Sequence, residues 1–62
     1  MKISYDTHIA SRITRILVEG ITQTPRGPAR VSASESMPAE ESDLSQRNAM
    51  ERLVIEIKRQ AL

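Results

Sequence analysis

Residues 9–21, IASRITRILVEGI, decide whether the first part of this chain is helical or extended. Apolar side chains in this stretch recur three and four residues apart, which is the spacing of one helical face. Asp6 before the stretch can cap a helix start, and Gly20 fits a helix end. The spacing therefore predicts an amphipathic helical segment within residues 1–21. Its apolar face comprises Ile9, Ala10, Ile13, Ile16 and Leu17.

Strand formation is the competing interpretation of the same segment. Many of its residues are β-branched, which favours strands, and Glu19-Gly20 can turn a hairpin. Polar and apolar side chains also alternate from Lys2 to Tyr5, which allows a short N-terminal strand. The sequence does not decide between helix and strand here, and helix is the preferred interpretation. The β-branched residues are Ile13, Thr14, Ile16, Val18, Ile21 and Thr22.

A second amphipathic helix is expected over residues 44–62. Asp43 can cap its start and Gln46 can complete a capping box, while Lys58 and Arg59 suit the negative end of the helix dipole. Leu44, Ile55 and Leu62 lie on a second apolar line, which indicates either scattered surface residues or contacts from two sides. The main apolar stripe consists of Met50, Leu53, Val54, Ile57 and Ala61.

The middle of the chain, residues 22–43, contains all three prolines and no visible hydrophobic period. Pro25 and Pro28 flank Gly27, a combination that interrupts helices and strands. We therefore expect a flexible linker rich in proline and serine. The fold expected from the whole sequence is all-α, with two amphipathic helices joined by a long mobile linker.

Composition narrows the functional classes. The chain has 62 residues, one histidine, two glycines and no cysteine, which argues against disulfides, metal sites and a glycine-rich phosphate loop. We expect no enzyme activity, no catalytic residue, no cofactor and no metal. The apolar runs are too short to span a membrane, and no signal peptide is evident. A cytoplasmic protein without a membrane partner is expected.

The apolar stripes are expected to bind either a second copy of the chain or a larger protein partner. A hairpin of two helices cannot bury both of its stripes, and no disulfide compensates for this. We therefore expect a small non-enzymatic regulatory or adaptor protein, ordered as a homodimeric bundle or on a protein partner. The expected partner-binding residues are Ile9, Ile13, Ile16, Leu17, Met50, Leu53, Val54 and Ile57.

Nucleic-acid binding is the less favoured alternative. A strand at Lys2–Asp6 followed by two helices resembles the layout of ribbon-helix-helix repressors, although the 22–43 connection is longer than that family's turn. The resemblance implies a small dimeric DNA-binding regulator, with Arg12 and Arg15 as contacts to the nucleic-acid backbone. The net charge of +1 and pI of about 8.3 are low for a nucleic-acid-binding domain.

Overall fold

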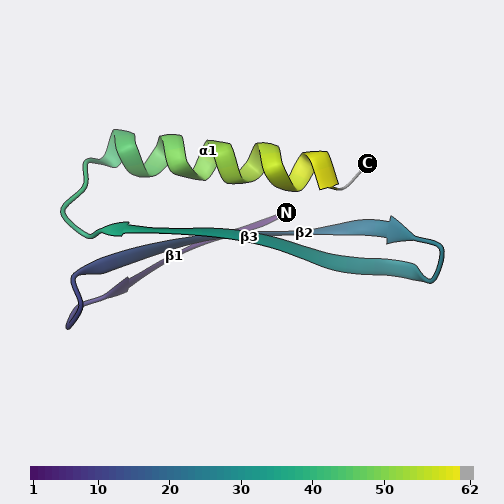
Figure 1. Cartoon of the computed structure of the whole chain (residues 1–62), viewed down its shortest axis with the longest axis horizontal. Helices are drawn as coiled ribbons and strands as arrows, with labels where there is room; N and C mark the ends of the chain where they lie inside the picture. Colours follow the sequence, from purple (N-terminus) through teal and green to yellow (C-terminus); the bar gives the residue numbers. More distant parts are fainter. Residues whose placement is uncertain (61–62) are drawn as a thin grey trace.

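A computed structural model describes residues 1–60 as an antiparallel sheet of three strands with one helix on one of its sides (Figure 1). The strands lie in the order of the chain: β1 (Lys2–His8), β2 (Ile13–Thr24) and β3 (Gly27–Pro38). The helix α1 (Asp43–Gln60) follows β3. The β2–β3 hairpin extends beyond the N-terminal end of β1, because β1 pairs only with residues 13–19 of β2.

The expected all-α fold with two helices is wrong, because residues 9–12 form a turn and residues 13–24 form the central strand β2. Thr14, Ile16 and Val18 are buried, with exposed fractions of 3%, 0% and 0%. This period of two places them on the side of the sheet that α1 covers. The helical spacing in 9–21 is therefore coincidental, and the β-branched composition was the better indicator.

The prediction of a flexible linker at residues 22–43 is also wrong, because this segment contains the end of β2 and all of β3. Half-buried and exposed residues alternate along the whole of β3. Val31, Ala33 and Met37 pack against the core. Pro28 and Pro38 are tolerated because β3 is an edge strand, where an absent N–H need not break the ladder.

The proline and glycine residues that resembled a linker form a tight hairpin turn. Thr24 pairs with Gly27, so Pro25 and Arg26 are the two loop residues. The Thr24 hydroxyl donates to the Gly27 carbonyl at 2.7 Å, and the Arg26 N–H donates to Thr24 Oγ1 at 3.2 Å. Gly27 has a φ of 112°, which a residue with a side chain rarely adopts.

A helix is present where the C-terminal amphipathic helix was expected. Its N-terminal cap is Ser42 and not Asp43, because the Ser45 N–H donates to Ser42 Oγ at 3.1 Å. Asp43 instead lies in the first turn. Ala61 and Leu62, which were expected on the two apolar lines of this helix, lie outside the described residues. Within residues 1–60, no helix has the length and apolar character required to span a membrane.

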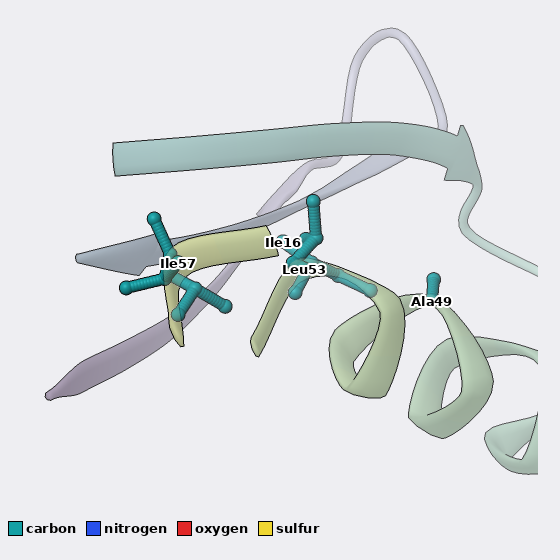
Figure 2. Packing of buried hydrophobic residues seen from close by; sticks show 5 residues of the cluster. Ile16, Ala49, Leu53 and Ile57 are labelled. Atoms are coloured by element: carbon teal, nitrogen blue, oxygen red, sulfur yellow. The ribbon is translucent and has the colours of Figure 1, made fainter. Parts of the chain in front are cut away.

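The core lies between α1 and the two strands that it covers, β2 and β3. One row along the helix, Ala49, Leu53 and Ile57, points at the sheet (Figure 2). These residues pack against Ile16 and Val18 of the central strand. Ala49 and Ile57 are fully buried and Leu53 is 8% exposed. The described core is thus small and centred on β2.

Gly20 fixes how closely the end of α1 approaches the sheet. A Cβ atom at this position would lie 2.7 Å from Ile57 Cγ2, which is closer than two carbons can pack. Thr22 lies two residues after Gly20 on β2, and its hydroxyl donates to the Gln60 carbonyl at 3.2 Å. The absence of a side chain at Gly20 therefore lets α1 rest directly on the hairpin.

Gly20→Ala should lower the free energy of unfolding by about 1–3 kcal/mol, because the new methyl group must displace Ile57. Urea denaturation followed by circular dichroism measures this change. Ile57→Leu removes Cγ2, so the two substitutions together should cost less than the sum of their separate effects by about 1 kcal/mol. Strictly additive effects would show that the contact does not limit the approach of the helix.

Candidate interaction surface

The sheet has a covered side, which faces α1, and an open side. Alternation along the strands and the antiparallel register assign each residue to one side. On β1, Ile3 and Tyr5 belong to the covered side, because they pair with Val18 and Ile16. Lys2, Ser4, Asp6 and His8 belong to the open side.

On β1, the side of the sheet that faces α1 is largely exposed to solvent. Ile3 is 43% exposed and Tyr5 is 51% exposed, although their cross-strand partners Val18 and Ile16 are both 0% exposed. The cause is the position of α1, which packs on β2 and β3. Two apolar side chains, including the only aromatic one in the chain, therefore border the core without being enclosed by it.

The flank of α1 that faces β1 is apolar as well. Arg52 reaches the opposite edge of the sheet, where its Nη2 lies 2.8 Å from Glu35 Oε2 of β3. Met50 and Val54 lie about 160° around the helix from Arg52, which places them on the flank toward β1. Both are half-buried and pack against the core.

The outer edge of β1 adjoins this apolar strip. In the sheet order β1-β2-β3, β1 has a neighbouring strand on one side only. Such an edge presents unpaired backbone N–H and C=O groups that can pair with another chain. We name the combination of this edge with Ile3, Tyr5, Met50 and Val54 the β1 surface.

The open side of the sheet has a different character. Its central row on β2 alternates apolar and charged residues, with Arg15 and Glu19 between Ile13, Leu17 and Ile21. The adjoining row on β3 contains Ser32, Ser34 and Ser36.

Charges of opposite sign face each other across the open side. Asp6 pairs with Arg15 in register and Lys2 pairs with Glu19. Arg30 Nη1 also lies 3.9 Å from Glu19 Oε2. The cations are therefore interleaved with anions and do not form a basic patch.

The structure separates the partner-binding residues that the sequence suggested. Ile16, Leu53 and Ile57 pack inside the chain's own core, and Met50 and Val54 belong to the β1 surface. Ile13 and Leu17 lie on the open side, and Ile9 is 86% exposed in the β1–β2 turn. Contact between any of these residues and a partner stays a prediction.

The two arginines suggested as nucleic-acid contacts do not adjoin a strand-helix-helix unit. Arg12 ends the β1–β2 turn with a φ of 54°, and Arg15 lies exposed on β2. The ribbon-helix-helix layout is therefore not the layout of residues 1–60, because a strand and not a helix follows β1.

Sequence reasoning missed Ile3 and Tyr5 as surface residues. The signal was the alternation of polar and apolar residues from Lys2 to Tyr5, together with the position of the single aromatic residue. If residues 9–21 formed a helix, β1 would have no strand to pair with, so the alternation did not predict that Ile3 and Tyr5 lie beside the core.

The single histidine lies at the end of β1. His8 Nδ1 lies 2.8 Å from Ser11 Oγ in an exposed turn. Within residues 1–60, no three histidine or acidic residues gather closely enough to hold a metal ion. Buried side-chain polar atoms in this part of the chain all have hydrogen-bond partners.

Comparison with protein families, with characterised proteins and with solved structures gives no match. The chemistry of the β1 surface is therefore the basis for the functional interpretation.

Tyr5 and Ile16 are cross-strand partners that should respond very differently to truncation. Tyr5→Ala should lower the free energy of unfolding by about 1 kcal/mol or less, since it removes mainly a cross-strand contact. Ile16→Ala should cost about 2–5 kcal/mol, because it leaves a cavity in the core. The measurement is chemical denaturation at a concentration where the chain is monomeric by mass. Equal effects would mean that Tyr5 is enclosed like Ile16.

Proposed function

We propose that this chain is a small non-enzymatic adaptor or regulatory protein that binds another protein chain through the β1 surface. The observation that carries the proposal is the exposure of Ile3 and Tyr5 beside a core in which their cross-strand partners are fully buried. In this proposal, the binding partner completes a core that the chain itself leaves open.

Strand addition is the proposed mode of binding. An extended segment of the partner pairs with the outer edge of β1, so backbone hydrogen bonds supply affinity. Alternate side chains of that segment then meet Ile3 and Tyr5. Met50 and Val54 form the opposite wall, which places the partner's apolar side chains between the helix and the edge strand.

Charge supports a protein partner over a nucleic acid. A nucleic-acid interface concentrates Lys and Arg on one face, whereas Lys2 and Arg15 on the open side each face a carboxylate. The β1 surface itself is mainly apolar, which suits a protein segment better than a phosphate backbone. A cytoplasmic location, as expected from the sequence, belongs to the same proposal.

Site-specific photocrosslinking tests the proposal. The photoreactive residue p-benzoylphenylalanine replaces Tyr5 in one version of the chain and Ser34 in a control version. Ser34 is exposed on the open side of β3, away from the β1 edge. After irradiation in the cells that encode the chain, position 5 should give a defined protein adduct, identified by mass spectrometry, and position 34 should not.

Ile3→Glu, introduced into the chain that carries the photoreactive residue at position 5, provides a matched control. It places a carboxylate in the apolar strip at a position that is 43% exposed, so the fold should persist while the adduct at position 5 is lost. Circular dichroism checks the fold. Identical adducts from positions 5 and 34, or an adduct that survives Ile3→Glu in a folded chain, would rule out the β1 surface as the binding site.

A further inference from the structure

The first residues of β1 have a self-complementary pattern. Lys2, Ile3, Ser4, Tyr5 and Asp6 read cation, apolar, serine, apolar, anion. The chemical type is therefore symmetric about Ser4, except that the two outer residues carry opposite charges. Two copies of such a strand, placed antiparallel, offer each cation to an anion.

Symmetry restricts how two copies of β1 can pair. In an antiparallel pair related by a two-fold axis, one residue must face its own copy. With Ser4 at that position, Lys2 faces Asp6 of the second copy on the open side. Ile3 faces Tyr5 of the second copy on the side that α1 covers. Both contacts occur twice.

Cross-strand neighbours within the chain extend this charge pairing. Asp6 faces Arg15 on β2, and Lys2 faces Glu19. In the paired sheet, a row of four charges therefore runs Arg15, Asp6, then Lys2 and Glu19 of the second copy. The signs alternate along the whole row, and the two-fold axis generates a second such row. Opposite charges directly across a strand pair stabilise it, and like charges destabilise it.

The neighbouring registers lack this complementarity. With Tyr5 facing its own copy, Lys2 faces His8, Ile3 faces Thr7 and Asp6 faces Ser4 of the second copy. With Ile3 at the two-fold axis, Asp6 extends beyond the second copy's β1. Only the Ser4 register pairs the charged residues with each other and the large apolar residues with each other.

We infer that the occupant of the β1 surface is a second copy of this chain, paired antiparallel through β1 with Ser4 on the two-fold axis. The assembly is a sheet of six strands with both helices on the same side. This inference rests on the proposed function, because it names the partner of the same surface. Tyr5 and Ile3 of the second copy pack beside Ile3 and Tyr5, which removes part of the surface that these side chains expose in one chain.

A charge exchange between two versions of the chain tests the register. Lys2→Glu alone gives a homodimer with two acidic pairs, and Asp6→Lys alone gives one with two basic pairs. An equimolar mixture of the two variants allows a heterodimer in which both pairs are again opposite in charge. Contacts within each chain are the same in the homodimer and the heterodimer, so their difference reports only the intermolecular pairs.

Sedimentation velocity over a dilution series provides the measurement. The wild-type chain should dimerise, each single variant should have a dissociation constant higher by about tenfold or more, and the mixture should dimerise more tightly than either variant alone. The control pair, Arg26→Glu and Glu40→Lys, changes exposed charges in turns away from β1. These variants should dimerise like wild type, alone and mixed.

Ser4→Cys gives a second readout that does not depend on charge. The chain has no cysteine of its own, and residues that face each other across an antiparallel pair have Cβ atoms about 4.5–5.5 Å apart. Mild oxidation should therefore link two copies through Ser4→Cys at concentrations where Ser34→Cys remains unlinked.

The outcomes separate the inference from the proposed function. A wild-type chain that is monomeric at every concentration overturns the inference, and so does a mixture that dimerises no better than its components. If position 5 then still crosslinks to a different protein, the proposed function stands with another partner. If position 5 gives no specific adduct, both proposals fail.

Discussion

One helix covers two strands of a sheet that has three, and the remaining features of this molecule depend on that mismatch. A helix with its side chains is about 10 Å across, whereas three strands occupy about 14 Å. The absence of a side chain at Gly20 lets the end of α1 lie close to β2, and α1 packs on β2 and β3. Ile3 and Tyr5 are therefore exposed by the geometry of the fold and not by a local irregularity.

The size of the chain makes this exposure consequential. Chains of about 60 residues bury only about 60% of the surface that they expose when unfolded, and their stability is marginal. Here the tyrosine at position 5 is the single aromatic side chain, and half of it lies outside the core. A partner that binds the folded chain adds its binding free energy to folding. Association at the β1 surface thus stabilises the same core that positions the surface.

The C-terminal helix was predictable because several local signals agree. The apolar residues Met50, Leu53, Val54 and Ile57 have the spacing of one helical face, and Lys58 and Arg59 occupy the last turn. Even there, the cap was misplaced by one residue, since serine and aspartate at positions 42 and 43 are both good caps.

The strands were harder to predict, because their signals were weak or shared with a helix. In β3, the inward residues include Ala33 and Met37 beside exposed serines, so the alternation has little hydrophobic contrast. In β2, Ile13, Ile16 and Leu17 fit a helical spacing by coincidence, although Ile13 and Leu17 face the open side. Pairing with both neighbours decided the outcome for this central strand, and pairing is a non-local property.

The two edges of the sheet differ in a way that bears on how association ends. Pro28 and Pro38 leave β3 without an N–H near each end, so the outer edge of β3 is a poor template for another strand. The side chains of Arg52 and Glu35 pair beside the same edge. The edge strand β1 contains no proline. Pairing through β1 alone therefore gives a closed pair of chains, because each copy then presents only the β3 edge. An open-ended sheet would require both edges to pair, and the prolines of β3 disfavour that.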